Sequence, residues 1–149
     1  MEKTKNPSGN VWMKGLFNGL FAYILGFAVY MLPGIIISVK MGFTLGPQSN
    51  DPAALSADIS QAISGMYSGS IPLAVLLIVF TSLFIIWRSR TVSKKYGGDA
   101  IRNGLFVSAV PVCLTLLFMI TGGVDWISVL EIFVYPGAGY LSAVILRNA

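Results

Sequence analysis

The sequence predicts an all-α integral membrane protein: a bundle of four transmembrane helices with one short external amphipathic helix. Hydrophobic residues make up 55% of the 149 positions and charged residues only 11%, whereas about 25% charged is usual in soluble globular proteins. Four apolar runs are long enough to cross a bilayer as helices. The basic residues gather at the ends of these runs, where they set the orientation of a membrane protein. The length suits a single domain, residues 1–149.

The first predicted span covers residues 16–39. The lysines before it, Lys3, Lys5 and Lys14, are also typical of the start of a signal peptide. The apolar run of roughly 24 residues is, however, longer than the 7–15 residues of a signal-peptide core. We therefore expect an uncleaved transmembrane helix.

Proline and glycine residues predict two features of this first helix. Pro33 and Gly34 lie in its outer third and predict a kink, because proline removes a backbone hydrogen bond. Gly15 and Gly19 are one turn apart and would allow the backbone of another helix to come close. Small residues that only relieve crowding are an equally good interpretation of this pair.

The polar segment 40–71 follows, and we expect it to contain a short helix over about 52–64. Asp51 and Pro52 suit the N-cap and the first position of a helix. Apolar residues recur after them at spacings of three and four, which predicts one face turned to the bilayer or to the bundle: Leu55, Ile59, Ala62, Ile63 and Met66. The alternative is a flexible loop rich in Ser, Ala and Gly.

A basic segment, residues 87–102, overlaps the end of the second predicted span, residues 72–88. Five basic residues in it are opposed by the single acid Asp99: Arg88, Arg90, Lys94, Lys95 and Arg102. These cations are candidates for contact with anionic lipid headgroups, at roughly 1 kcal/mol each near the surface. The alternative interpretation is a topology signal without a ligand.

The third predicted span covers residues 101–121, and the fourth covers residues 126–146. Pro111 lies in the middle of the third span and frees backbone groups that need partners in a membrane. We expect the hydroxyl groups of Ser108 and Thr115 to bond these groups.

The distribution of basic residues predicts the orientation. Nine of the ten Lys and Arg residues lie at the N-terminus, in the 87–102 segment and at Arg147, whereas only Lys40 lies on the opposite side. Four spans place both termini on the same side of the membrane. The positive-inside rule then predicts that both termini are cytoplasmic and that the 40–71 segment is outside.

Glu131 is the only acidic residue inside a predicted span. Carboxylates within membranes often mark ion or proton paths, and Lys40 is the one basic residue on the same side that could pair with it. Glu131 lies only six residues after Asp125. We therefore expect its side chain to sit at the edge of the headgroup region and to reach water, with the ion path as the alternative.

The 135–140 segment of the fourth span is the second candidate site. Its residues would suit an unwound stretch whose carbonyl groups bind an ion or a substrate: Tyr135, Pro136, Gly137 and Gly139. A kink that packs against small residues of a neighbouring helix is the alternative interpretation.

Catalysis and metal binding are not expected. The chain has no histidine and one cysteine, Cys113, so it lacks the usual zinc ligands and a histidine-based triad. It also has no phosphate-binding glycine motif. We expect no cofactor and no nucleic acid, because topology and anionic lipid account for the net charge of +4.

Two functional classes remain. The first is a small non-catalytic accessory or structural subunit of a larger membrane complex, which the many small residues favour. The alternative is a small oligomeric transporter or channel that uses Glu131 and a helix break at 135–140. The partners are the lipid bilayer together with other membrane subunits or further copies of this chain. The sequence names neither the partner nor the substrate.

Overall fold

The computed structural model describes residues 11–48, 51–67 and 70–147, and the fold-class prediction is confirmed. These residues form five α-helices and one short 3-10 turn, Gly46–Gln48, without a β-strand among them. Four of the helices are long and apolar enough to cross a membrane: α1 (Val11–Leu45), α3 (Ile71–Tyr96), α4 (Ala100–Gly122) and α5 (Trp126–Arg147). The fifth helix, α2 (Pro52–Tyr67), is shorter and is not among them. Lys3 and Lys5 lie outside the described residues.

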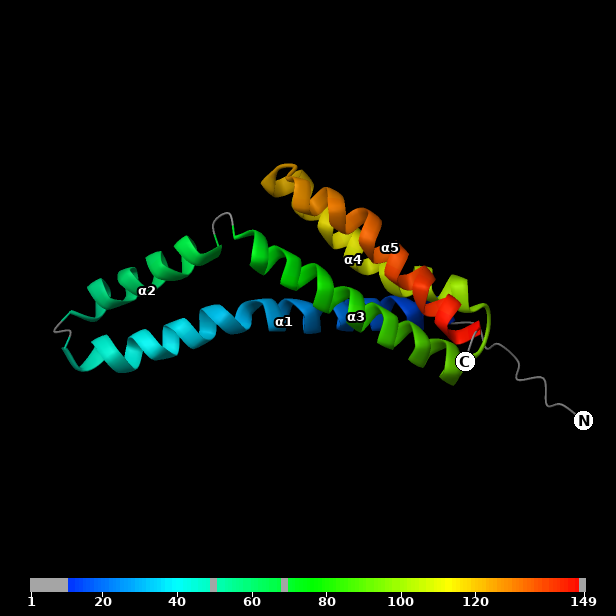
Figure 1. Ribbon diagram of the computed structural model, residues 1–149, viewed down its shortest axis with the longest axis horizontal. Helices are drawn as coiled ribbons and strands as arrows, with labels where there is room; N and C mark the ends of the chain where they lie inside the picture. Colours follow the sequence, from blue (N-terminus) through cyan, green and yellow to red (C-terminus); the bar gives the residue numbers. More distant parts are fainter. Residues whose placement is uncertain (1–10, 49–50, 68–69, 148–149) are drawn as a thin grey trace, which may run out of the picture.

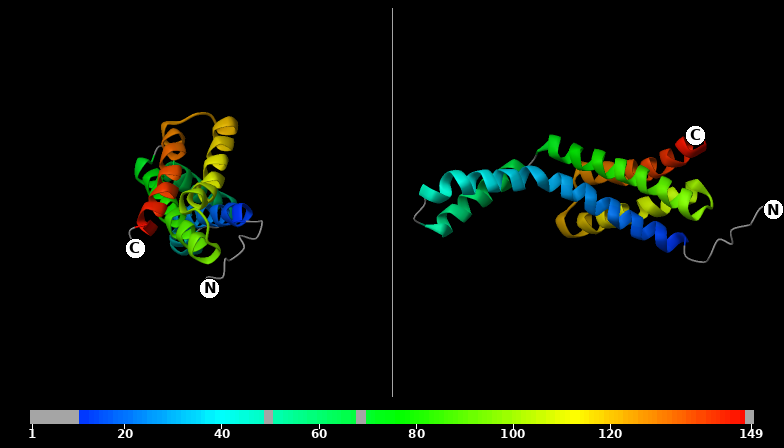
Figure 2. Two further views of the ribbon diagram at one scale, coloured as in Figure 1. Left: turned by 90° about the vertical axis from the view of Figure 1, so that its right-hand side faces the viewer. Right: turned by 90° about the horizontal axis from the view of Figure 1, so that it is seen from below.

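The four long helices form a closed bundle. Both α1 and α5 pack against α3 and α4, and α3 also contacts α4 across the middle. The start of α1, the connection between α3 and α4, and the end of α5 lie at the same end (Figure 1; Figure 2 gives the view along the bundle). This is the end that carries most of the basic residues, and we call it the basic end.

The helix α1 is longer than the predicted span of residues 16–39. Its 35 residues correspond to about 52 Å at a rise of 1.5 Å per residue, whereas the hydrocarbon core of a bilayer is about 30 Å thick. The lone charge of Lys40 does not end the helix, which continues to Leu45 and stops before Gly46 and Pro47. Residues 35–45 of α1 and the antiparallel α2 form a two-helix arm at the end of the molecule opposite the basic end (Figure 1).

The start of α2 has the expected cap. The backbone N–H of Ala53 donates to Oδ1 of Asp51 at 2.9 Å, which satisfies one of the free donors of the first turn. The helix continues to Tyr67, three residues past the predicted end. Its predicted apolar face is half-buried, with Leu55, Ile59 and Ile63 of intermediate exposure, and α2 packs against α1.

Tyr67 attaches the end of α2 to α1 beside Pro33. Its hydroxyl donates to the carbonyl oxygen of Tyr30 at 2.9 Å and accepts from the backbone N–H of Gly34 at 3.2 Å. These two backbone groups are four residues apart, so they are the pair that an undisturbed helix joins directly. The Tyr67 hydroxyl thus bridges one turn of α1 at the position where proline weakens the helix.

Glycine residues set the distances between the helices. A Cβ atom on Gly15 would lie 2.7 Å from the Cβ of Phe106, and one on Gly19 would overlap the carbonyl oxygen of Val107. The predicted close approach at this pair is therefore confirmed, and the approaching helix is α4. In the same way Gly104 of α4 and Gly139 of α5 meet backbone to backbone.

The connection between α3 and α4 is built from two glycines and a cap. Gly97 and Gly98 have φ values of 71° and 87°, which favour glycine because a side chain would be strained there. The backbone N–H of Ile101 donates to Oδ1 of Asp99 at 3.0 Å. The side chain of Asn103 donates to the carbonyl oxygen of Gly97 at 2.9 Å. The tight turn between two long helices is therefore held from both sides.

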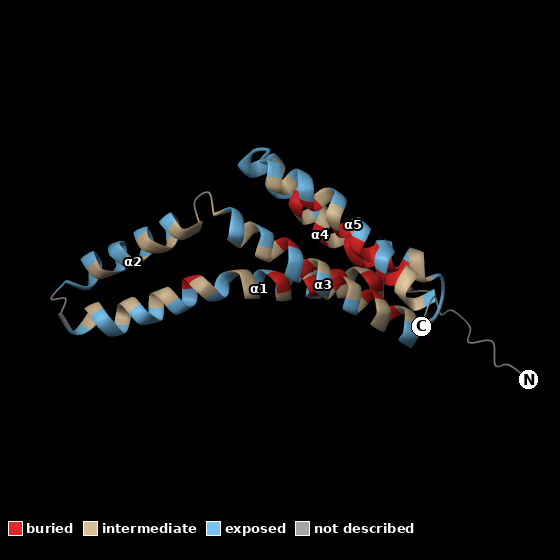
Figure 3. Ribbon diagram, in the orientation of Figure 1, coloured by how far each residue is buried: buried red, intermediate tan, exposed pale blue. Residues whose placement is uncertain are grey.

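Buried residues are concentrated where the four long helices meet, and the arm has none (Figure 3). No residue of α2 is buried, and Gly34 is the last buried residue of α1. About a third of the buried residues are polar or charged: Thr81, Ser89, Asn103, Ser108, Thr115, Glu131 and Ser142. The interior of the bundle therefore contains hydroxyl, amide and carboxylate groups that could take part in binding.

Candidate functional site

Glu131 lies inside the bundle, so the expectation that it reaches water is wrong. Its side chain is only 6% exposed, and its Oε2 accepts a hydrogen bond of 2.7 Å from the hydroxyl of Thr115 on α4. The buried face of α5 recurs at helical spacing through Glu131, Tyr135, Ala138 and Ser142. The rotation of α5 about its own axis therefore turns the carboxylate inward, although it is close to the end of the helix.

Thr115 has a different role from the predicted one. The expectation was that its hydroxyl would bond a backbone group freed by Pro111, but it donates to the carboxylate of Glu131. Ser108 donates to the carbonyl oxygen of Leu105 at 3.1 Å. A charge-assisted bond to a carboxylate is stronger than a neutral one, which explains why the hydroxyl of Thr115 points to α5.

Two further hydroxyl groups lie beside Glu131. Tyr135, one helical turn later on α5, is fully buried, and its hydroxyl lies close to Glu131 and to Thr81 of α3. Neither contact has the geometry of a hydrogen bond, so the Tyr135 hydroxyl and the Thr81 Oγ1 have no partner among the described residues. Tyr23 of α1 is within electrostatic range of the carboxylate.

Together these side chains form a layer across the bundle, which we call the polar layer: Tyr23, Thr81, Thr115, Glu131 and Tyr135. Each of the four long helices contributes at least one of them. Gly26 of α1 makes room for the layer, because a Cβ atom there would overlap the hydroxyl of Thr81. The groups that interact electrostatically with the Glu131 carboxylate are Thr115, Tyr135 and Asp125, and none of them is basic.

Lys40 does not belong to this site. It is exposed and belongs to the arm, six residues past Gly34, which is the last buried residue of α1. Glu131, in contrast, is buried among α3, α4 and α5. The structure therefore does not bring together the pair that the sequence suggested, because Lys40 lies in the part of α1 that extends past the bundle.

The predicted helix break at 135–140 is also wrong, because α5 is a continuous α-helix from Trp126 to Arg147. Pro136 is half-buried and Gly137 is exposed with open space around it. Gly139 is buried against Gly104, so its role is close packing of α5 on α4. The carbonyl groups of this segment are therefore within a continuous helix and not in an unwound stretch.

The basic side chains near the connection between α3 and α4 rest on aromatic rings. The Arg88 guanidinium lies 4.4 Å from the ring centroid of Phe21, and the Lys14 ammonium lies 4.2 Å from that of Tyr96. Weaker contacts join Lys95 to Tyr96 and Arg102 to Phe106. Arg90 and Lys94 line a shallow groove on α3 with Leu83, Ile86, Trp87 and Thr91.

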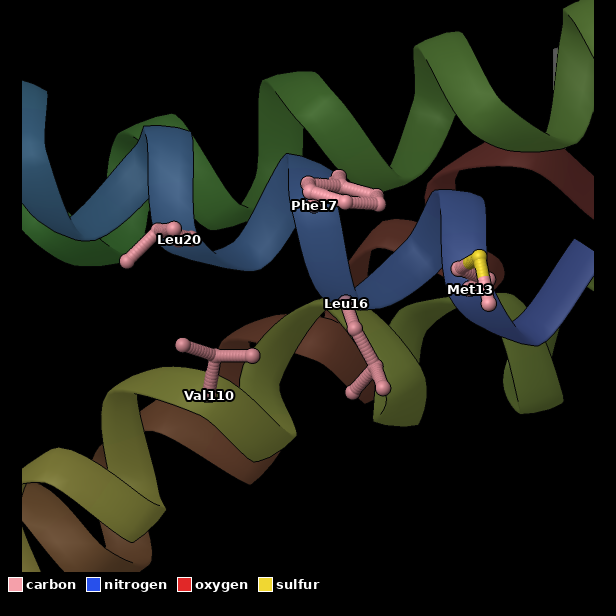
Figure 4. Close-up of a pocket in the computed structure, with 5 residues that line it drawn as sticks. All are labelled: Met13, Leu16, Phe17, Leu20 and Val110. Atoms are coloured by element: carbon pink, nitrogen blue, oxygen red, sulfur yellow. The ribbon is translucent and has the colours of Figure 1, made fainter.

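A second groove lies between α1 and α4 and is lined by apolar side chains alone. Met13, Leu16, Phe17 and Leu20 come from α1, and Val110 comes from α4 (Figure 4). It offers no group that could bind an ion or orient a polar substrate. The polar layer is therefore the better candidate for a functional site.

Comparison of the chain with protein-family models, curated proteins and solved structures finds no match. The geometry of the polar layer consequently carries the functional argument by itself. Sequence reasoning found Glu131 and Tyr135 but missed Thr81, Thr115 and Tyr23 as their neighbours. The sequence holds only a weak indication of Thr81: it lies on a stripe of α3 with Ile78 and Ile85 at spacings of three and four. Such a stripe predicts that Thr81 is buried, but it does not identify the residue on another helix that Thr81 faces.

Proposed function

We propose that this protein is a small membrane transporter or channel for protons or a small monovalent cation, in which Glu131 carries the ion. The observation that supports the proposal is a buried carboxylate bonded to Thr115 and acted on by no basic group in the described part of the chain. An unpaired carboxylate is costly in a membrane. Binding a proton or a cation removes this cost, and loss of the ion restores it.

The unpartnered hydroxyl groups of Tyr135 and Thr81 supply oxygen atoms beside the carboxylate. Hydroxyl oxygens can accept from a water molecule or contact a small hard cation, and buried hydroxyl groups without partners are rare in folded proteins. The polar layer thus contains the type of group that an ion needs when it leaves water.

Flux measurements test this proposal. Purified protein is reconstituted into phospholipid vesicles, and flux of H⁺, Na⁺ and K⁺ is followed under an imposed potential. We expect Glu131→Gln to lower the flux to that of empty vesicles, because it keeps the size of the side chain and removes its charge. The matched control is Asp58→Asn, which removes the charge of an exposed carboxylate on α2. Wild-type vesicles without flux, or equal flux in both variants, would contradict the proposal.

A second candidate function is that of a non-catalytic accessory subunit of a larger membrane complex. Backbone contact between Gly104 and Gly139, and the close approach at Gly15 and Gly19, favour it because such packing suits a rigid bundle more than one that opens. Purification in a gentle detergent distinguishes the two functions. Other chains that co-purify in fixed ratio support the accessory role, and a homo-oligomer supports transport.

The orientation and the lipid contact are part of the same proposal. We infer that both termini and the basic 87–102 segment are cytoplasmic, which rests on the nine-to-one division of basic residues. Arg90 and Lys94 flank the groove on α3, where an anionic headgroup would meet two cations and an acyl chain would meet Leu83 and Ile86. Binding of the protein should therefore favour phosphatidylglycerol over phosphatidylcholine.

A further inference from the structure

The arm extends well past the outer end of the bundle. The bonds from Tyr67 to Tyr30 and Gly34 place the end of α2 beside Gly34, and α3 begins at Ile71, four residues after Tyr67. The residues of α1 beyond Gly34 are numbers 35–45, which add about 16 Å of helix. This part of α1 packs against α2, whereas the first half of α1 packs against the other long helices (Figures 1 and 2).

An exposed apolar stripe continues along α1 from the bundle into the arm. Residues at spacings of three, four and seven share this face and are large and exposed: Phe17, Phe21, Ile24, Met31, Ile35, Val39 and Phe43. Phe43 is 80% exposed, although a phenylalanine at such a position in water is unfavourable. The stripe does not end where the bundle ends.

The stripe in the arm faces away from α2. At about 100° per residue, Val39 lies about 140° and Phe43 about 180° around α1 from Gly34, and Gly34 is the residue that Tyr67 contacts. Exposed residues on α2 are small or polar, including Asp58, Ser60 and Gln61, and none of them is a large apolar residue. The arm therefore has one apolar side, formed by α1, and one polar side, formed by α2.

We propose that the arm lies in the outer surface of the membrane, with the apolar stripe of α1 in lipid and α2 on the water side. The occupant of the stripe is the bilayer, because the same stripe continues from the part of α1 that faces lipid in the bundle. From Phe17 to Phe43 the stripe is about 39 Å long. This is longer than the hydrocarbon core of about 30 Å, so the last part of the stripe, which lies in the arm, reaches the outer interface.

The proposal changes the role of the external helix. The apolar residues of α2 are not its contact with the bilayer, because the half-buried Leu55, Ile59 and Ile63 form the face that packs against α1. It covers the side of α1 that would otherwise meet water. An amphipathic unit of this kind lies in the interface plane, and its position does not depend on whether Glu131 carries an ion.

Spin-label accessibility tests the proposal. The full chain with Cys113→Ser and Phe43→Cys is labelled with a nitroxide and reconstituted into phosphatidylcholine vesicles. Collisions with O₂, which concentrates in lipid, and with a water-soluble nickel chelate are measured. Matched controls are Ile24→Cys on the same stripe and Gln61→Cys on the polar side of α2. Both control positions are exposed.

We expect position 43 to behave like position 24, with high O₂ accessibility and a nickel accessibility several-fold below that of position 61. Nickel accessibility equal to that of position 61 would mean that the arm projects into water, and would overturn the proposal. Low accessibility to both reagents would mean that protein covers the stripe, such as a second copy of the chain, and would overturn it as well. A Val39→Cys label repeats the measurement one turn away.

Discussion

The Tyr67 hydroxyl makes the sharpest structural prediction, because one oxygen atom joins two backbone groups of another helix. Tyr67→Phe removes the bonds to the carbonyl of Tyr30 and to the N–H of Gly34 and keeps the aromatic ring, whose centroid lies 4.9 Å from that of Tyr30. A hydrogen bond contributes about 0.5–1.5 kcal/mol net, and about 0.6 kcal/mol on average within membrane proteins. The two bonds together should contribute about 1–2 kcal/mol.

This free energy corresponds to a factor of about 5–30 in the equilibrium between the attached and the detached arm. Hydrogen–deuterium exchange of peptides that cover residues 30–38 measures this equilibrium, because the backbone N–H of Gly34 loses the Tyr67 hydroxyl as its acceptor when the arm detaches. We expect exchange in this region to rise by about that factor in Tyr67→Phe, with the rest of the bundle unchanged.

Tyr30→Phe is the matched control. It removes a hydroxyl group that takes no part in either bond, because only the backbone carbonyl of Tyr30 is used. Its exchange should equal that of the wild type. If Tyr67→Phe and Tyr30→Phe gave the same exchange, the Tyr67 hydroxyl would not hold α2 on α1 and the reasoning would be refuted.

Three further predictions concern the bundle and its orientation. Gly104→Ala should lower the free energy of unfolding by about 1–3 kcal/mol, because its Cβ would overlap the backbone of Gly139. Gly137→Ala should stabilise the helix by about 0.5–1 kcal/mol, because a Cβ there meets nothing within 4 Å. Thermal unfolding in detergent compares the two variants. Thr115→Val should destabilise the wild-type protein more than it destabilises the Glu131→Gln variant, because the Thr115 hydroxyl donates to the Glu131 carboxylate. Equal effects in the two backgrounds would show that this bond contributes little. Ser60→Cys in a Cys113→Ser background should react with an impermeant thiol reagent from the outside of the cell only, and labelling solely from the cytoplasmic side would reverse the orientation.

The membrane architecture could be predicted because it depends on quantities that are local in sequence. Apolar runs longer than a bilayer is thick must cross it as helices, since an unpaired backbone group in lipid costs several kcal/mol. The caps at Asp51 and Asp99 likewise depend only on a residue and its next neighbours. The Gly15 and Gly19 pair predicted a close helix contact for the same reason, since the missing side chains are visible in the sequence.

The candidate site was only half predictable. Glu131 stood out as the one acid within a span, but its depth along α5 suggested contact with water. Whether it reaches water depends on the rotation of α5, and that rotation is set by the contact of Gly139 with Gly104 on another helix. The partner Thr115 comes from α4 and is sixteen positions away, so no local pattern identifies it.

The sequence by itself determined that four helices are long and apolar enough to cross a membrane, and which residue is the unusual carboxylate. Only the tertiary structure decided that Glu131 faces inward to Thr115, that the 135–140 segment stays helical, and that Tyr67 attaches α2 to α1. The physical reason is that the length and polarity of a helix are properties of its own residues. Its rotation and its contacts depend on side chains from other helices, and those contacts exist only after the bundle has packed.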